Sequence, residues 1–305
     1  MKFIEVKNNN DNESIHLSYC DYGIGKPVVL IHGWPSSKEM WEYQVGSLVD
    51  AGFRVIKYDR RGFGKSDKPW NSYDYDTLAA DLHSILEQLN LNDVTLVGFS
   101  MGGGEVARYF AKYGNDRISN AVLVSSVLPF LLKTNDNEDG IPNEKSVEMM
   151  ESISNDRIGF LDNFGKQFFG IGMLNHPVSA PLLDYFGMLA SVASPRATLE
   201  CMKAFGTTDF RKDVLKINVP TLIIHGNSDK IVPIEISSDK LSKLVPDNQY
   251  LIYEGAPHGL FYTHRDRLNN DLIEFINTGF VRNDTEDTMF IPGDNVVITR
   301  DPLGF

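Results

Sequence analysis

Cysteine is almost absent from this chain of 305 residues, which contains only Cys20 and Cys201. Two cysteines this far apart in sequence form neither a disulfide framework nor a Cys-x-x-Cys metal site, so we expect free, buried thiols. No group of His, Cys, Asp and Glu residues has the spacing of metal ligands either. The sequence therefore predicts a protein without a metal and without a cofactor.

Positive charge and long apolar runs are also scarce. The 29 Lys and Arg residues against 41 Asp and Glu residues give a net charge of −12. This balance disfavours nucleic acids and anionic membranes as partners, because both need clustered positive charge. No apolar run approaches the about 18 residues of a membrane span, and polar residues 7–12 lie where the apolar part of a secretory signal would be. We therefore expect a cytoplasmic protein.

Two patterns of apolar residues alternate along most of the chain. Continuous apolar runs are typical of strands buried in a parallel sheet, and apolar residues at helical spacing are typical of the helices that cover it. Their alternation implies right-handed crossovers, so we expect an α/β fold with a mostly parallel sheet. Residues 2–6 and 14–20 predict an additional hairpin at one sheet edge. The predicted central strands are 27–31, 53–58, 94–97, 121–124, 220–225 and 249–253, and the predicted helices are 38–50, 76–90 (capped by Asp76 or Thr77), 105–110, 234–244 and 264–277.

The alternation is interrupted after Pro129. Residues 130–210 mix Gly, Pro and aromatic residues with short helical stretches and contain no clean strand, which predicts a helical lid inserted into the domain. The resulting organisation is a domain over residues 1–278 that carries this lid, followed by a C-terminal extension over residues 279–305. Within the extension, residues 294–299 predict a short strand.

A serine with the context of a nucleophile follows the predicted strand at 94–97. Gly98-Phe99-Ser100-Met101-Gly102 joins that strand to a helix, and the two glycines remove side chains that would collide in such a sharp turn. Ser100 would then lie at the start of a helix, where free N–H groups favour developing negative charge. A Gly-x-Ser-x-Gly pattern also arises by chance, so the reading requires a base, an acid and oxyanion donors elsewhere in the chain.

The acid and the base are predicted at the ends of later strands. A serine hydroxyl needs an imidazole to take its proton, and a third group must orient that imidazole. Asp229 follows the strand at 220–225, and His258 follows the strand at 249–253, so both would meet Ser100 at one edge of a parallel sheet. The alternative for Asp229 is a turn-forming aspartate. His32 and His225 are expected to brace loops through hydrogen bonds.

Acyl transfer also needs two N–H donors for the oxyanion. The backbone of Met101, directly after the nucleophile, is one candidate. Trp34 is the other, because Gly33 lets the loop bend and Pro35 has no N–H to offer. The side chains of Trp34 and Met101 either line the acyl side of the pocket or pack in the core, and the sequence leaves both alternatives open.

Several motifs in one order carry a resemblance to a known family. Over residues 15–278 the chain resembles the bacterial aryl esterases and cofactor-free (non-haem) haloperoxidases, also called perhydrolases, of the α/β-hydrolase superfamily. This resemblance implies a mostly parallel sheet of about eight strands, flanked by helices and carrying a small helical lid. The motifs are His32–Pro35, Trp41–Gln44, Asp59–Gly64, Tyr73–Thr77, Gly98–Tyr109, Thr207–Arg211 and Gly255–Gly259.

The resemblance also implies an activity. It implies a serine esterase on small aryl or short-chain esters, with metal-free formation of peracids from hydrogen peroxide as a second activity. It assigns Ser100 as nucleophile, Asp229 as acid and His258 as base, with Trp34 and Met101 as oxyanion donors. The family associates a proline at the position of Pro35 with perhydrolysis, and its members are often trimers or hexamers. We further expect Pro35, Phe99, Ile231 and Val232 to contact the substrate.

Three alternatives remain beside this interpretation. Epoxide hydrolases share the loop around Trp34 but use a carboxylate nucleophile, which Ser100 does not supply. Lactone or amide hydrolysis uses the same serine chemistry on the same fold. A non-catalytic binding protein of this fold would typically have lost a member of the triad, and none is missing from the sequence.

Overall fold

The computed structural model describes residues 2–7, 13–282, 288–290 and 296–300. Within these residues ten strands form one sheet in the order β1-β2-β4-β3-β5-β6-β7-β8-β10-β9. Its central strands are parallel, whereas β1, β2 and β9 pair antiparallel with their neighbours. The strands are β1 (Lys2–Lys7), β2 (Ser14–Tyr22), β3 (Pro27–Ile31), β4 (Arg54–Tyr58), β5 (Val94–Phe99), β6 (Ile118–Val124), β7 (Thr221–Gly226), β8 (Asn248–Tyr253), β9 (Thr288–Phe290) and β10 (Val296–Arg300).

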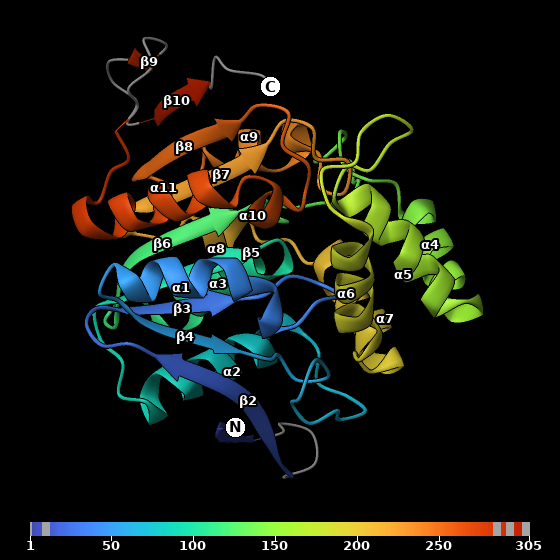
Figure 1. Cartoon of the computed structure of the whole chain (residues 1–305), viewed down its shortest axis with the longest axis horizontal. Helices are drawn as coiled ribbons and strands as arrows, with labels where there is room; N and C mark the ends of the chain where they lie inside the picture. Colours follow the sequence, from blue (N-terminus) through green and yellow to red (C-terminus); the bar gives the residue numbers. More distant parts are fainter. Residues whose placement is uncertain (1, 8–12, 283–287, 291–295, 301–305) are drawn as a thin grey trace.

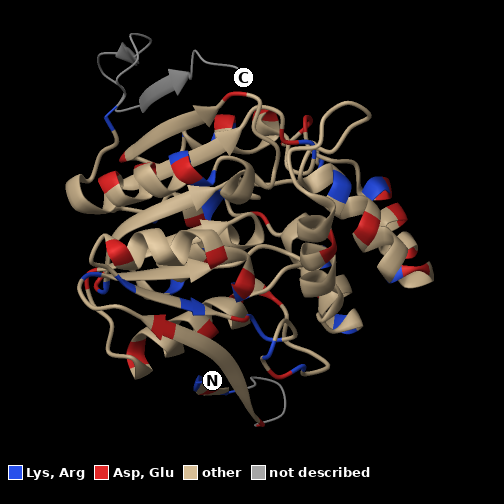
Figure 2. Ribbon diagram, viewed as in Figure 1, with Lys and Arg blue, Asp and Glu red and all other residues tan. Residues whose placement is uncertain are grey.

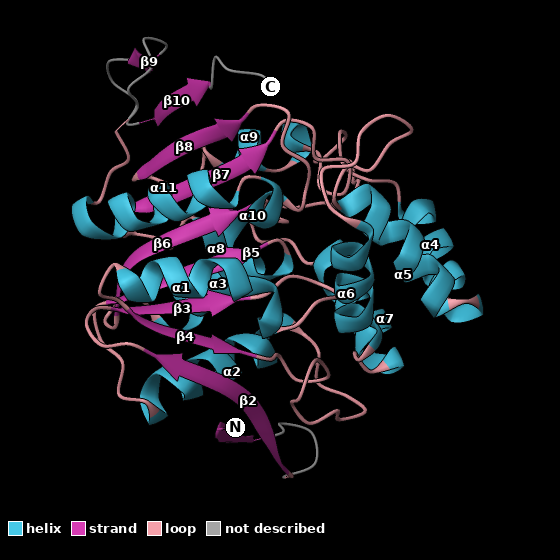
Figure 3. Cartoon of the chain, in the orientation of Figure 1, coloured by secondary structure: helices cyan, strands magenta, loops and turns pink. Residues whose placement is uncertain are grey.

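Helices cover both faces of this sheet, with α1 and α11 on the near face in Figure 1. Figure 3 shows the same layering, with strands in magenta and helices in cyan. The helices are η1 (Lys38–Trp41), α1 (Glu42–Asp50), α2 (Tyr75–Gln88), α3 (Met101–Tyr113), α4 (Asn143–Asn155), α5 (Arg157–Phe168), α6 (Ala180–Ser191), α7 (Pro195–Thr207), α8 (Arg211–Val214), η2 (Ile234–Ile236), α9 (Ser238–Leu241), α10 (Leu260–Thr263) and α11 (Arg265–Thr278).

The continuous apolar strands are explained by this three-layer arrangement. Val29 and Ile31 of β3 pack in one hydrophobic cluster with α2 and α3, while Val28 and Leu30 pack in a second cluster with α1 and α11. Successive side chains of a strand point to opposite faces, so both faces need apolar residues when both are covered. The predicted α/β class and mostly parallel sheet are confirmed.

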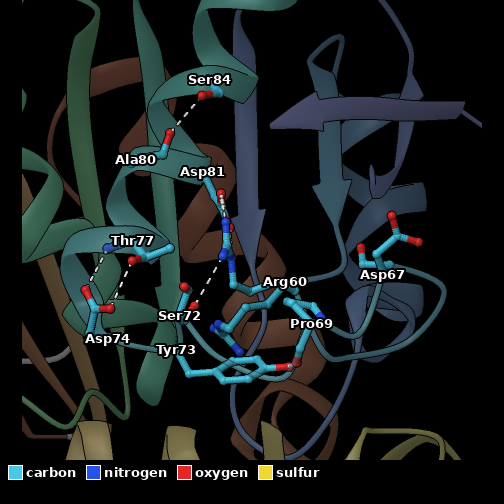
Figure 4. A network of polar contacts seen from close by, with 12 residues as sticks. Arg60, Asp67, Pro69, Ser72, Tyr73, Asp74, Thr77, Ala80, Asp81 and Ser84 are labelled. Carbon is cyan, nitrogen blue, oxygen red and sulfur yellow. Dashed lines mark hydrogen bonds and ion pairs between the residues drawn. The ribbon is translucent and has the colours of Figure 1, made fainter. Parts of the chain in front are cut away.

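The start of α2 differs from the sequence prediction. The cap is Asp74, not Asp76 or Thr77, because the Asp74 carboxylate accepts from both the backbone N–H and the hydroxyl of Thr77, each at 2.9 Å (Figure 4). The loop before the helix is tied down nearby, where the Tyr73 hydroxyl donates to the carbonyl of Pro69 (Figure 4). Asp, Ser and Thr all cap helices well, so composition alone left the first residue undecided.

Five helices, α4 to α8, follow one another in the chain between β6 and β7, and the first four of them, α4 to α7, form a group. Figure 1 shows them (green to yellow) beside the ends to which the arrows of β3 and β5 to β8 point. They therefore lie over the edge where loops after parallel strands converge. The division into a domain over residues 1–278 with a lid at 130–210 stays a prediction.

The predicted strand at 294–299 corresponds to β10, which pairs parallel with β8 and extends the sheet beyond the expected eight strands. Within the predicted extension, residues 283–287, 291–295 and 301–305 lie outside the described residues.

Figure 2 shows acidic and basic residues interspersed along the ribbon of the described part of the chain. In the same residues, every helix is too short or too polar to cross a membrane. Cys20 and Cys201 are free thiols, and Cys201 is buried as expected, whereas Cys20 is only half-buried.

Candidate active site

The turn between β5 and α3 holds Ser100 in a strained backbone conformation. Its φ is 53° and its ψ is −117°, which places a residue with a side chain in a region that mostly glycine adopts. The flanking glycines allow the tight packing around it. A Cβ on Gly98 would lie 2.7 Å from the carbonyl oxygen of Gly102, and one on Gly102 would lie 2.7 Å from that of Ile31. The turn therefore requires both glycines.

The structure brings Ser100, His258 and Asp229 into one chain of hydrogen bonds. The Ser100 hydroxyl lies 3.0 Å from Nε2 of His258, and Nδ1 of His258 lies 2.6 Å from Oδ2 of Asp229. All three side chains are buried. An ionised carboxylate only accepts hydrogen bonds, so Nδ1 of His258 carries the proton. Its Nε2 is then free to accept from the serine, which is the protonation state that a general base needs.

Asp229 is held by four hydrogen bonds. Its Oδ1 accepts from the backbone N–H groups of Ile231 (2.8 Å) and Val232 (2.9 Å). Its Oδ2 accepts from His258 and also from Nε2 of His225 at 3.1 Å. Burial by itself would raise the pKa of Asp229, but attraction to the two imidazoles and their hydrogen bonds hold it well below its usual range. The carboxylate therefore stays ionised.

The contact between His225 and Asp229 is a feature that the sequence did not reveal. The predicted role of His225 as a loop brace is confirmed, because Nδ1 lies 2.7 Å from the Ser238 hydroxyl and Nε2 lies 2.9 Å from the Val232 carbonyl. The position of His225 at the end of β7, four residues before Asp229, is the sequence signal that could have revealed this second contact.

The two expected oxyanion donors, Met101 and Trp34, belong to two different segments that both lie next to Ser100. Met101 is the first residue of α3, so its N–H is one of those that a helix leaves without an internal partner. The loop after β3 lies directly against Ser100, since a Cβ on Gly33 would come within 3.2 Å of the serine Cβ. Trp34 follows in that loop. This arrangement suits the stabilisation of a negative charge that develops beside Ser100.

A small apolar cavity of about 70 Å³ opens beside Ser100. Ile231 and Val232 line it, as expected of residues that contact a substrate. The lid helices contribute most of the remaining wall, so the shape of the cavity depends on how the lid packs. The other lining residues are Trp34, Val127, Leu131, Ile141, Ser146, Met149, Phe164, Met202, Phe205 and Gly206.

The structure resolves the two alternatives for the side chains beside the oxyanion donors. The Trp34 ring lines the cavity and is also packed, with its indole N–H donating to the Thr198 carbonyl (2.9 Å) and its ring 5.2 Å from that of Phe164. The Met101 side chain is fully buried in the core instead.

Two other expected substrate contacts lie away from this cavity. Phe99 is fully buried and packs its ring 4.9 Å from that of His258 and 5.1 Å from that of Phe261. The structure therefore places Phe99 behind the histidine, because the residue before the nucleophile still belongs to β5 and points into the sheet–helix core. Pro35 lines a second cavity, between α5 and α6.

Comparison with known proteins decides the family. The model of the alpha/beta hydrolase fold family matches residues 26–265. The chain belongs to this family. A Synechocystis sp. protein named as a non-heme chloroperoxidase is 44% identical over 277 residues, which cover 90% of this chain and 100% of that protein. A bifunctional esterase/perhydrolase of Acinetobacter calcoaceticus is 36% identical over 267 residues, covering 87% and 97%.

A solved structure agrees with these relatives. The crystal structure of bromoperoxidase from Bacillus anthracis is 49% identical, has a TM-score of 0.86, and covers 90% of this chain and 100% of that chain. The resemblance predicted from the motifs is confirmed: this α/β-hydrolase stands among non-haem haloperoxidases and esterases. In the described residues, no group of three or more His, Cys, Asp or Glu side chains could hold a metal ion.

A buried ion pair connects the two segments that carry Trp34 and Met101, the expected oxyanion donors. Arg60 binds the Glu105 carboxylate on α3 and donates to the carbonyl of His32 (2.7 Å), at the start of the loop that contains Trp34. His32 accepts the Arg60 backbone N–H at Nε2 (3.0 Å) and bonds the Gly33 carbonyl through Nδ1 (2.9 Å). Burial and the nearby Arg60 lower the pKa of His32 well below its usual range, so it braces this loop as a neutral ring.

We predict that Glu105→Gln lowers the free energy of unfolding by about 3 kcal/mol, because it leaves the Arg60 guanidinium buried without its counter-charge. Burial raises the pKa of Glu105, whereas Arg60 and Tyr58 oppose that rise. The buried Glu105 carboxylate and the Arg60 guanidinium therefore stabilise each other's charged form. Urea unfolding at pH 7 measures the loss. Glu151→Gln on the exposed face of α4 is the matched control, and equal stability of the two variants would contradict the prediction.

Proposed function

We propose that this α/β-hydrolase is a serine esterase that works through an acyl-enzyme and also transfers the acyl group to hydrogen peroxide. The observation that carries the proposal is the unbroken hydrogen-bonded chain from Ser100 through His258 to Asp229, which ends at an apolar cavity. The esterase/perhydrolase of A. calcoaceticus and the haloperoxidases among the relatives support it. The roles of the individual residues below are part of this proposal.

Acylation begins at the ester carbonyl. The Ser100 oxygen attacks the carbonyl carbon while its proton passes to Nε2 of His258. The carbonyl oxygen becomes an oxyanion and accepts from the N–H groups of Trp34 and Met101, each of which contributes on the order of 3 kcal/mol to the lowering of the barrier. Asp229 stabilises the imidazolium. The proton of His258 then passes to the leaving oxygen, the bond from carbon to that oxygen breaks, and the alcohol departs.

Deacylation repeats these steps with a different nucleophile. His258 takes a proton from water, the hydroxide oxygen attacks the acyl carbon, and the proton returns to the Ser100 oxygen as the acid leaves. When hydrogen peroxide replaces water, its oxygen forms the new bond to the acyl carbon and the product is a peracid. No electron transfer is required, because the peroxide O–O bond stays intact. The same triad therefore supports hydrolysis and perhydrolysis.

The alternative functions fit the same site less well than an esterase does. An epoxide hydrolase mechanism requires a carboxylate at the position of Ser100. A binding protein without activity has no need of a serine that is strained, buried and bonded to an oriented imidazole. Lactones and amides meet the same nucleophile, so a substrate panel separates them from esters.

The function is tested by such a panel with pure protein, run with and without hydrogen peroxide. We expect turnover of phenyl and p-nitrophenyl acetate, little turnover of long acyl chains because the cavity beside Ser100 is small, and peracid formation when peroxide and acetate are supplied. An absence of ester turnover across the panel would overturn the proposal.

We predict that Pro35→Leu lowers the ratio of peracid formation to ester hydrolysis about tenfold, which corresponds to ~1.4 kcal/mol in the barrier. Pro35 directly follows Trp34, the proposed oxyanion donor. Both residues lie in a turn in which the Ser36 N–H donates to the Gly33 carbonyl (3.1 Å). Leucine restores an N–H and frees φ, so the Trp34 carbonyl beside the peroxide can reorient. An acetate-plus-peroxide assay, compared with p-nitrophenyl acetate hydrolysis, measures the ratio. Pro246→Leu at an exposed position is the control; an unchanged ratio in Pro35→Leu would remove the role of this proline.

Two further expectations belong to the proposal. A trimer or hexamer is implied by the resemblance, and the mass of the protein in solution tests it. A cytoplasmic location is consistent with the two free thiols, because oxidising compartments favour disulfides.

A further inference from the structure

A second cavity lies between helices α5 and α6, next to the cavity that Ser100 lines. It has a volume of about 220 Å³ and is bounded mainly by α5, α6 and the loop after Trp34. Phe164 is the one described residue that lines both cavities. The remaining residues around the second cavity are Pro35, Ser36, Ile158, Leu161, Asp162, Gly165, Phe168, Phe169, Leu183, Asp184, Phe186, Gly187, Ala190 and Ser191.

This second cavity is on the histidine side of the active site. Phe168, which lines it, packs its ring edge-on at 4.9 Å from the ring of His258. A backbone hydrogen bond also connects Phe168 to the histidine loop. The N–H of Gly259, the residue after His258, donates to the Phe168 carbonyl (2.8 Å). The oxyanion loop reaches the same cavity through Pro35 and Ser36. Two cavities therefore adjoin the site where a substrate carbonyl would bind, one lined by Ser100 and one lined by Phe168 next to His258.

The chemistry of acylation decides which part of the ester enters which cavity. His258 must give its proton to the leaving oxygen, so the leaving group lies on the histidine side of the carbonyl. We propose that the second cavity binds the leaving group of the ester, and that Phe164 separates it from the acyl group in the cavity beside Ser100. This inference rests on the proposed esterase function and adds the class of alcohol that the site accepts.

The lining indicates the chemistry of that alcohol. Most of the wall is aliphatic or aromatic, which favours a bulky apolar alcohol or a phenol. The Ser36 hydroxyl is buried and has no hydrogen-bond partner among the described residues, so it is available to a polar atom of the ligand. Among the described residues, the charged members of the lining are Asp162, which pairs with Lys166 (2.7 Å), and Asp184. The cavity therefore suits a neutral or positively charged leaving group and disfavours one with a carboxylate.

A size series at Gly187 tests the assignment. Gly187 lies within α6 and faces the cavity, and a Cβ there would meet no atom within 4 Å. Gly187→Ala, Gly187→Leu and Gly187→Trp therefore fill the cavity progressively without a clash at the backbone. Gly46→Leu is the matched control, because Gly46 is an exposed glycine within α1 that also has open space at its Cβ.

The readout compares two esters with the same acyl group, 1-naphthyl acetate and methyl acetate. We expect kcat/KM for the naphthyl ester to fall stepwise along the series, by at least tenfold at Gly187→Trp, while kcat/KM for methyl acetate changes less than twofold. Melting temperatures close to that of the wild type show that the variants are folded. A series in which both esters respond alike, or neither responds, overturns the assignment.

Charge provides a second arm of the experiment. Phenyl acetates that carry a trimethylammonium or a carboxylate group on the leaving phenol are compared in the wild type and in Asp184→Asn. We expect the preference for the cationic ester to fall about threefold in the variant, a small effect because the Asp184 side chain is exposed and its charge is screened by solvent. No change in the preference would refute the predicted class of leaving group. Failure of the wild type to hydrolyse any ester would instead refute the proposed function, so the two failures are distinguishable.

Discussion

We expect Ser100→Ala to reduce kcat for p-nitrophenyl acetate by about 10⁶-fold, since it removes the proposed nucleophile and with it the acyl-enzyme pathway. The oxyanion donors and the cavity remain, so a residual acceleration of about 10³-fold over water is expected. Alanine keeps the Cβ of serine, and the strain of the positive φ at this position is unchanged. The loss therefore reports chemistry and not unfolding.

The measurement uses pure protein and steady-state kinetics with and without hydrogen peroxide. Peracid formation should disappear together with hydrolysis, because both pass through the same acyl-enzyme. Ser152→Ala is the control: this serine lies on the exposed face of α4, where its hydroxyl bonds only the Glu148 carbonyl within the same helix (2.8 Å). Near-normal turnover in Ser100→Ala would mean that another residue is the nucleophile. Loss of hydrolysis with intact peracid formation would separate the two reactions.

The sheet could be predicted because each strand is marked by the residues of its own short segment. A strand covered on both faces needs apolar side chains on both, so β3, β5 and β7 stand out as continuous apolar runs. Parallel strands also place their carboxyl ends at one edge, so the positions of Ser100, Asp229 and His258 directly after predicted strands were enough to predict that they meet. The need for glycine at positions 98 and 102 could be predicted for a similar reason. The backbone passes so close to these residues that there is no room for a Cβ.

Other features depend on contacts between segments far apart in sequence. Phe164 gains its place between two cavities only from the packing of α5 against the loop after β3, and nothing in the local pattern of the lid specifies that packing. The same holds for Phe99, whose neighbour in sequence is the nucleophile but whose ring lies behind His258. The second partner of Asp229 was missed because a histidine at a strand end is compatible with many contacts.

The contact of His225 with Asp229 affects the result that we expect for Asp229→Asn. In the wild type, Oδ2 receives one N–H from His258 and one from His225, and the carboxylate accepts both. Asparagine keeps an oxygen for the N–H groups of Ile231 and Val232 but presents an NH₂ group to the two imidazoles. The N–H donors of the asparagine side chain then face the N–H donors of His258 and His225, and no acceptor lies between them. His258 relieves the clash by moving its proton from Nδ1 to Nε2, the atom that has to accept the proton of Ser100.

We therefore predict that Asp229→Asn lowers kcat by about 10⁴-fold while the protein stays folded, in line with the cost of holding a catalytic histidine in the wrong tautomer. Asp247→Asn, at an exposed position before β8, is the control and should leave kcat unchanged. His225→Gln provides a contrast, because it removes one donor to Oδ2 without changing the tautomer of His258 and should cost far less than Asp229→Asn. Equal losses in these two variants would contradict the tautomer argument.

The pH dependence of stability gives Asp229→Asn an independent readout. The folded-state pKa of Asp229 is depressed, so its ionised form adds stability above its unfolded pKa of about 3.9, and that stability is lost as the pH falls below this value toward the folded pKa. Asparagine has no proton to bind. The wild type should therefore lose more unfolding free energy than Asp229→Asn between about pH 5 and pH 2, as measured by urea unfolding at each pH. Parallel acid profiles would show that the two imidazoles do not stabilise this carboxylate, and the tautomer argument would lose its electrostatic basis.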